Sequence, residues 1–223
     1  KKNYKKLIKI KNKNIFYVYE YSFIKFIYSI LLDKYDNKQF SILDYGGGLG
    51  NTILEIIKKE YFHENLRVSV YDTNYELVKT AKHFFNKYIE KKYLKKINFL
   101  KKLKKNQSFD AIHFGSMFEH IFEEHKFFDE LFANIKKKPK HIFFSDVFIT
   151  KNQSEFYCIG RYYGQSYIVK FHTLKNLIKI MSSYNYNLID KKIYLPNING
   201  QYRFYDMSNL PTKNQIFNTM NLH

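Results

Sequence analysis

The sequence contains no tryptophan, one cysteine and three prolines among 223 residues. A lone Cys158 excludes a disulfide within the chain and suits a reducing compartment, so we expect a cytoplasmic protein. Long charge-free apolar runs are also missing. The best candidate, residues 15–32, carries Glu20 and Lys25, and we interpret it as a partly buried helix rather than a membrane span. No signal peptide is expected, because the basic start lacks an apolar core followed by small residues.

Arginine is scarce as well. Of the 38 Lys and Arg residues, which against 20 Asp and Glu give a net charge of +18, only Arg67, Arg161 and Arg203 are arginine. A basic chain suggests a nucleic-acid partner, but surfaces that read bases depend on the arginine fork. The abundance of Lys, Asn, Ile, Tyr and Phe is typical of AT-rich codons. We therefore expect no specific nucleic-acid partner.

Short apolar runs alternate with segments of helical spacing. This alternation predicts an α/β fold, in which a mostly parallel central sheet carries helices on both faces in a Rossmann-like arrangement. The expected strands are 40–45, 67–72, 97–100, 109–114 and 141–147, with further strand-like runs at 186–195 and 202–207. The expected helices are 15–35, 51–60, 74–93, 121–137 and 173–184. Residues 148–171 show no clear period.

Glycine is rare too, yet four of the eight glycines fall within residues 46–50, in "LDYGGGLG". A P-loop would need lysine after the last glycine, where Asn51 stands, and a G-x-G-x-x-G dinucleotide loop would need glycine at that same position. The spacing is instead G-x-G-x-G, directly before a predicted helix. Backbone N–H groups and the positive helix end are then expected to face a compact anion such as an amino-acid carboxylate. Asp44 is placed to accept from an ammonium group.

These residues resemble the first motif of class I S-adenosylmethionine-dependent methyltransferases, Asp/Glu-x-Gly-x-Gly-x-Gly. Two further features are similar: Asp72, which ends the next strand in "VSVYDTN", and "FDAIHFGSMFEHI" at 109–121. The resemblance covers about residues 38–147. It implies the class I methyltransferase fold, with S-adenosylmethionine as cofactor, S-adenosylhomocysteine as product and Asp72 holding the ribose. The implied cofactor-binding residues are Asp44, Tyr45, Gly46, Gly47, Gly48, Asn51, Asp72, Thr73, Phe114, Gly115 and Ser116.

The chain looks most like small bacterial methyltransferases encoded in surface-polysaccharide (capsule or lipopolysaccharide) gene clusters. That resemblance implies O-methylation of a small sugar-linked or phosphate- or phosphoramidate-type acceptor. We expect one methyltransferase domain over residues 1–223. It would comprise a helical segment 1–37, a cofactor-binding core 38–147 and an acceptor-binding part 148–223.

A hydroxyl acceptor gains from a general base, for which His120 is the first candidate and Asp146 the second. An acceptor that is already anionic needs none. In "GRYYGQSY", Arg161, Tyr162 and Tyr163 suit an anionic acceptor, although the segment is equally consistent with an ordinary loop. Some methyltransferases hold a divalent metal with Glu-x-x-Glu-His. Ser116 stands at the first position here, so no metal is expected.

Other interpretations stay open. The glycines could serve only a tight turn, Asp72 could cap the next helix, His120 could be structural, and His113 is expected to pack within its strand. An RNA methyltransferase is one alternative function, but the D/N-P-P-Y/F tetrapeptide of base methylation is replaced by "HFGSM". A non-catalytic methyltransferase-like subunit is another, and the intact glycine loop argues against it.

Overall fold

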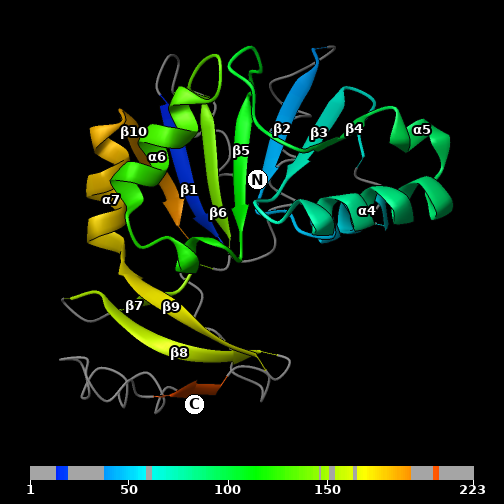
Figure 1. The fold of residues 1–223 in the computed structure, drawn as a ribbon. Coiled ribbons are helices and arrows are strands. Elements are labelled where there is room, and N and C mark those ends of the chain that lie inside the picture. The colour runs from blue at the N-terminus through cyan, green and yellow to red at the C-terminus, as the bar shows by residue number, and fades with distance from the viewer. Residues whose placement is uncertain are drawn as a thin grey trace.

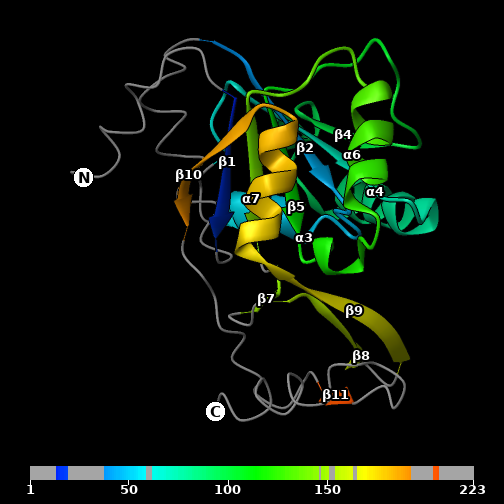
Figure 2. The ribbon, with the colours of Figure 1, turned by 90° about the vertical axis from the view of Figure 1, so that its left-hand side faces the viewer.

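The computed structural model describes the chain in seven segments, residues 14–19, 38–58, 62–145, 147–150, 154–162, 165–191 and 203–205. These segments form two sheets: a seven-stranded sheet with helices on its faces, and a separate four-stranded sheet. The smaller sheet lies beyond the ends to which the parallel strands of the larger one point, below it in Figures 1 and 2. No helix within these segments has the length and apolar character that a membrane span requires.

The larger sheet has the strand order β10-β1-β6-β5-β2-β3-β4, and every described pairing in it is parallel. In that order the strands are Tyr186–Lys191, Asn14–Tyr19, His141–Ser145, Ala111–Gly115, Phe40–Tyr45, Leu66–Tyr71 and Ile97–Leu100. The helices are α3 (Asn51–Lys58), α4 (Tyr75–Tyr88), α5 (Lys91–Leu94), α6 (Glu124–Ala133) and α7 (Leu174–Ser183), with a 3₁₀ turn, η1, at Phe118–His120. The predicted Rossmann-like α/β class is confirmed.

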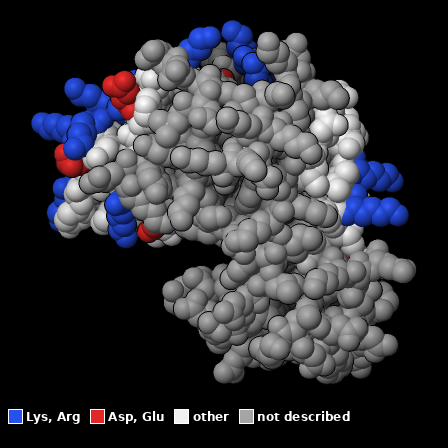
Figure 3. Space-filling model, turned by 180° about the vertical axis from the view of Figure 1, so that it is seen from behind, with Lys and Arg blue, Asp and Glu red and all other residues white. Residues whose placement is uncertain are grey.

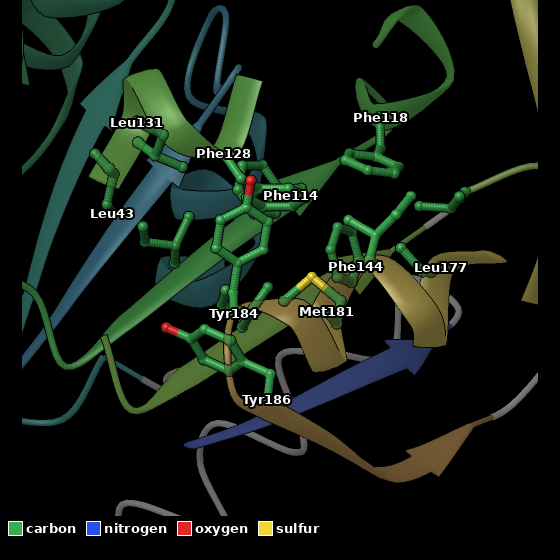
Figure 4. Packing of buried hydrophobic residues seen from close by; sticks show 14 of the residues in the cluster. Leu43, Phe114, Phe118, Phe128, Leu131, Phe144, Leu177, Met181, Tyr184 and Tyr186 are labelled. Carbon is green, nitrogen blue, oxygen red and sulfur yellow. The ribbon is translucent and has the colours of Figure 1, made fainter. Parts of the chain in front are cut away.

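Alternate residues of the central strands face two separate hydrophobic cores. In β2, Ile42 packs with α3 and with Phe85 of α4, whereas Leu43 packs with Phe128 of α6 and Met181 of α7. Figure 4 shows the second core, with aromatic rings from sheet and helices meeting between α6, α7 and the strands. Helices therefore cover both faces, which explains why these strands are apolar at nearly every position.

The chain reverses its direction of travel across the sheet at β2. From β2 it continues through β3 to β4 at one edge, and then returns to β5 and β6 on the other side of β2. In open parallel sheets, ligands bind beyond the carboxyl ends of the strands at such a switch point. The loops after β2 and β5, which hold the glycines and "SMFEH", meet at this place.

Most predicted elements are confirmed within a few residues, but the predicted helix at 15–35 is wrong where the structure describes it. Residues 14–19 form strand β1, which pairs with β6 and β10. A short apolar run cannot be assigned by periodicity alone, and its β-branched and aromatic composition favours a strand. Residues 20–37 lie outside the described segments. The predicted helix at 121–137 is shorter, because η1 and a turn precede α6.

The smaller sheet comes mainly from the stretch without clear period. Its order is β11-β8-β9-β7, with bounds Arg203–Tyr205, Phe156–Tyr162, Gln165–Thr173 and Ile149–Thr150. Strands β8 and β9 form an antiparallel hairpin, in which the rings of Phe156 and Phe171 stack at 4.7 Å between centroids. Phe148 stacks on Phe171 at 5.1 Å. These three buried rings form the apolar contact at the base of the hairpin.

A buried ionic cluster joins this hairpin to the main body. The Lys170 ammonium of β9 donates to Glu124, at the start of α6, and to Glu155 Oε2 at 2.9 Å. His172 Nδ1 lies 3.2 Å from Glu124 Oε1, and its Nε2 donates to the carbonyl of Phe118 at 3.0 Å. Glu124, Glu155 and His172 also place possible metal-ligand atoms within 4.8 Å of one another. Lys170 already supplies a cation to both carboxylates.

The cluster holds Glu124 ionised. Burial of its carboxyl acts to raise the pKa, but hydrogen bonds from His172 and Lys170 outweigh burial and lower the pKa from 4.5 to about 2. Burial likewise acts to lower the pKa of Lys170, and its bonds with the two glutamates reverse the sign and raise it. A group whose pKa is lowered by folding stabilises the fold fully above its unfolded pKa. That contribution is lost as the pH falls toward about 2.

Lys170→Met should lower the free energy of unfolding by about 3–5 kcal/mol, because it leaves two carboxylates without their cation at a buried site. Denaturant titration measures this change. Lys126→Met is the matched control: Lys126 forms an exposed pair with Glu123 at 3.2 Å, which is worth at most about 1 kcal/mol. The difference in free energy of unfolding between parent and Lys170→Met should shrink as the pH falls from roughly 5 to 2, because protonation of Glu124 removes the same ion pair from the parent. Equal losses in both variants would contradict this account.

Candidate active site at the switch point

The loop between β2 and α3 needs glycine for two different reasons. Gly46, Gly48 and Gly50 have φ angles of +73°, +49° and +78°, a region that side chains with a Cβ disfavour. Gly47 has an ordinary φ, but a Cβ there would lie 2.7 Å from Asp44 Oδ2 and 2.9 Å from Val70 Cγ1. The loop is therefore turned sharply and pressed onto the end of β2.

The glycine N–H groups are used within the protein. Those of Gly46 and Gly47 donate to the carbonyl of Tyr71 at 2.8 and 3.1 Å, and that of Gly50 donates to the carbonyl of Gly47. Gly48 N–H donates to Asp72 Oδ2 at 3.0 Å. The four glycine N–H groups therefore hold the turns of the loop and Asp72, and the expectation that backbone N–H groups and the helix end face an anion stays a prediction.

The N–H groups that stay available are those at the beginning of α3. Among the residues the structure describes, the N–H groups of Leu49, just before α3, and of Asn51 and Thr52, in its first turn, donate to no acceptor. They lie where the positive end of the helix dipole adds to the attraction for an anion. The carboxylate-binding role expected of backbone N–H groups and the positive helix end fits this position.

Asp72 follows β3 and supports the loop from beside it. Its Oδ2 accepts from Gly48 N–H, and its Oδ1 accepts from Asn74 N–H at 2.8 Å. The N-cap of α4 is Asn74, which accepts from Glu76 N–H at 3.2 Å, so the capping alternative for Asp72 is wrong. Each carboxylate oxygen retains a second lone pair, and the ribose role of Asp72 stays a prediction. Neighbouring Thr73 is exposed.

Asp44, at the end of β2, is 2% exposed. Its Oδ1 accepts from His113 Nδ1 at 2.8 Å, and its Oδ2 has no partner among the described residues. A buried carboxylate oxygen without a donor is costly. The position therefore fits a cationic group such as the ammonium of an amino acid. His113 is 1% exposed within β5, as the sequence predicted.

The remaining candidate cofactor-binding residues differ in how far their side chains are buried. Tyr45 is partly buried against Tyr71 and Phe127, with ring centroids at 5.0 and 5.3 Å, and burial, with smaller effects of Tyr71 and Asp72, raises its pKa well above the usual value. Phe114 is 0% exposed in the core, so its side chain presents no surface to a ligand. Gly115 ends β5, and Ser116 follows it. Ser116 has φ +47°, an unusual value for a residue with a side chain.

His120, at the end of η1, lies between this edge of the sheet and the hairpin. Its Nδ1 donates to the carbonyl of Ile168 in β9 at 3.2 Å, and its ring meets Tyr167 edge-on at 5.3 Å between centroids. Its Nε2 lies 4.0 Å from Glu119 Oε1, and its side chain is 43% exposed. Burial lowers the pKa of His120, and the bond to Ile168 only partly offsets that effect.

The other acceptor candidates are known only in part. Asp146 and Tyr163 lie outside the described residues, and Arg161 and Tyr162 are described only as backbone of β8. Arg161 pairs in register with Ser166 of β9 and with Arg203 of β11. Sequence reasoning assigned no role to Arg203. The feature of the sequence that could have drawn attention to Arg203 is the scarcity of arginine. Two of the three arginines occupy paired positions of one sheet.

The sequence matches the methyltransferase domain family over residues 17–191. The match spans well over half of the chain, and the chain belongs to that family. Together with the loop and Asp44, this family makes the chain an S-adenosylmethionine-dependent methyltransferase domain, with S-adenosylmethionine as its cofactor. No curated protein sequence gives a significant match.

Several solved methyltransferase structures are similar in fold. A SAM-dependent methyltransferase from Aquifex aeolicus is 25% identical with a TM-score of 0.33, over 52% of this chain and 66% of that one. The glycopeptide N-methyltransferase MtfA, complexed with S-adenosylmethionine, is 8% identical with a TM-score of 0.44, over 70% and 68%. Magnesium protoporphyrin IX methyltransferase from Synechocystis PCC 6803 is 12% identical with a TM-score of 0.44, over 73% and 67%. The chain covers slightly less than two thirds of the Aquifex protein and about two thirds of the other two.

Gly47→Ala should weaken the binding of S-adenosylhomocysteine roughly tenfold or more, equivalent to about 1.4 kcal/mol, because the added Cβ displaces the Asp44 carboxylate. Isothermal calorimetry measures this affinity. Gly50→Ala is the control. Unlike Gly47, Gly50 has a positive φ, and a Cβ there would lie 3.1 Å from Phe85. The variant should therefore lose stability without displacing Asp44. Wild-type affinity in Gly47→Ala would show that Asp44 does not face the cofactor.

Proposed function

We propose that this chain transfers a methyl group from S-adenosylmethionine to a hydroxyl of a small, anionic, sugar-linked acceptor in surface-polysaccharide biosynthesis. The observation that carries the proposal is the geometry of His120, a half-exposed histidine fixed between the cofactor edge and the hairpin. The polysaccharide context is supported by the sequence resemblance. The anionic character of the acceptor is supported by the positions of the arginines.

The bound cofactor supplies a methyl group that is already activated on a sulfonium, so orientation accounts for much of the catalysis. The chain's own groups divide the work of holding it. Asp44 accepts from the ammonium group, and the free N–H groups at the beginning of α3 bind the carboxylate. Asp72, braced by Gly48 and Asn74, accepts from the ribose hydroxyls with its remaining lone pairs.

His120 is suited to remove the acceptor's proton. A carbonyl oxygen only accepts hydrogen bonds, so the contact with Ile168 requires the proton on Nδ1 and leaves Nε2 as the basic atom in the neutral ring. The lowered pKa keeps that ring neutral near pH 7. After proton uptake at Nε2, the carboxylate of Glu119 at 4.0 Å stabilises the imidazolium.

The hairpin offers the acceptor a positive group. The backbone positions of Arg161 in β8 and Arg203 in β11 are register partners. A phosphate or diphosphate linked to a sugar suits the guanidinium fork. An acceptor held there by its anionic group and methylated on a hydroxyl near His120 uses both features.

Charge alone gives little support to the RNA alternative. On the one face that Figure 3 shows, the described Lys and Arg side chains stand in separate groups at the top, left and right, and the described residues of that face form no continuous basic stripe. Binding that depends on scattered lysines is weak and falls steeply with salt. The alternative of a non-catalytic subunit is disfavoured by the intact loop and by the orientation of His120.

His120→Gln should lower kcat about 10²- to 10⁴-fold, the range for loss of a general base, with little change in affinity for S-adenosylhomocysteine. In the parent enzyme, kcat/KM should fall as the pH drops through the lowered pKa of His120, because the protonated ring cannot accept a proton. The variant should lack this limb of the pH profile. His83→Gln, an exposed histidine of α4, is the control. An unchanged kcat in His120→Gln would remove the base and favour an acceptor that is already ionised.

Arg161→Ala and Arg203→Ala should each raise the acceptor KM roughly tenfold or more, as expected when a charged hydrogen bond worth about 1.5–3 kcal/mol is lost. Cofactor affinity should stay unchanged, and the double variant should lose less than the sum, since both grip one anion. The assay compares nucleotide-sugars and sugar phosphates with uncharged methyl glycosides as acceptors.

Arg67→Ala is the control for the arginine variants, because within the described part of the chain Arg67 donates to the carbonyls of Glu64 and Leu66 and to no other group. Methyl transfer to bulk RNA at physiological salt, undiminished in Arg161→Ala, would overturn the proposal and favour an RNA methyltransferase.

A further inference from the structure

Three buried polar side chains form a hydrogen-bonded chain across the ends of adjacent strands. Asp44 of β2, His113 of β5 and Ser145 of β6 are 2%, 1% and 1% exposed. Asp44 and His113 are register partners, and Asp44 Oδ1 lies 2.8 Å from His113 Nδ1. His113 Nε2 lies 2.7 Å from Ser145 Oγ. These hydrogen bonds run perpendicular to the strands, from β2 through β5 to β6, and the Asp44 end lies against Gly47 of the glycine loop.

Two glycines, which have no side chain, leave the space that Asp44, His113 and Ser145 occupy. A Cβ on Gly115 would lie 2.8 Å from His113 Cε1 and 3.5 Å from Ser145 Oγ. A Cβ on Gly47 would lie 2.7 Å from the other end of the chain, Asp44 Oδ2. Side chains at either position would move the imidazole or the carboxylate, so the backbone around both ends is matched to their present positions.

The hydrogen-bond pattern gives each atom a fixed role. The carboxylate only accepts, so His113 Nδ1 donates to Asp44 Oδ1. In the neutral imidazole Nε2 is then an acceptor, and the Ser145 hydroxyl donates to it. This sequence of donors satisfies one oxygen of Asp44 and leaves Oδ2 without a partner among the described residues. A group of side chains arranged only for stability would be expected to satisfy both oxygens.

We propose that His113 and Ser145 are positioning residues. They orient the Asp44 carboxylate so that Oδ2 receives the ammonium of the cofactor's methionine portion. The inference rests on the ammonium-binding role given to Asp44 in the proposed function, and it does not depend on the identity of the acceptor. Ser145 is given no role as a nucleophile, because its hydroxyl is engaged with His113 Nε2 at 2.7 Å.

The test compares two ligands in a set of variants, using calorimetry on the full chain. S-adenosylhomocysteine carries the amino-acid portion, and 5′-methylthioadenosine lacks it. His113→Phe replaces the imidazole with an apolar aromatic ring. It should weaken the binding of S-adenosylhomocysteine at least tenfold while changing the affinity for 5′-methylthioadenosine by less than threefold (about 0.65 kcal/mol). His113→Asn places an amide N–H near the position of Nδ1, and should recover most of the affinity. Ser145→Ala should lose a few-fold for S-adenosylhomocysteine alone.

His141→Phe is the control for loss of a buried strand histidine. His141 is 4% exposed, but it lies at the opposite end of its strand, where β6 begins. The thermal unfolding midpoint of each variant is measured without ligand to separate folding from binding. The inference is overturned if His113→Phe binds S-adenosylhomocysteine like the parent, or if both ligands weaken by the same factor. Failure to methylate any sugar-linked acceptor would instead overturn the proposed function and leave these ratios unaffected.

Discussion

Parallel pairing of β2 with both β3 and β5 is the constraint on which the site depends. Because the three strands run in the same direction and in register, their carboxyl ends lie at one edge of the sheet. Asp44, Asp72 and the "SMFEH" segment each follow or end one of these strands, so residues distant in sequence meet there. A change in the register of β2 by one residue would turn Asp44 toward the opposite face. The packed cores on both faces oppose such a shift.

This edge is acidic in a chain that is strongly basic. Asp44, Asp72 and Glu119 lie around it, although the chain as a whole carries a net charge of +18. Two of the three carboxylates are buried, where they interact more strongly with a cation than they would in water. Such a site suits a cofactor with a sulfonium and an ammonium group. The overall charge of the chain is thus a poor guide to the charge of its ligand.

The sequence predicted those parts of the fold in which local pattern and tertiary environment agree. Strands 40–45 and 97–100 match to the residue, because a buried strand between turn residues gives an unambiguous signal. It mispredicted residues 15–19, where pairing with β6 and β10 decides the conformation. It also singled out Asp44 and the glycines, whose cofactor role stays a prediction, but it did not indicate their hydrogen-bond partners. The His113–Ser145 link and the Lys170 cluster join residues 32 and 46 apart, and nothing in local spacing encodes such contacts.

Hydrogen bonds connect the β8–β9 hairpin to η1, which carries the candidate base His120. Strand β9 meets η1 twice: Ile168 accepts from His120, and His172 donates to Phe118. His172 is in turn held by Glu124, which also bonds to Lys170. Any movement of β9 would therefore shift both the carbonyl that sets the tautomer of His120 and the backbone that carries it. In the proposed function the same hairpin carries Arg161, so the element that holds the acceptor's anionic group also orients the base. Acceptor binding and proton removal are then coupled through the two strands of one hairpin, and an acceptor that fails to engage the hairpin is not held near the base.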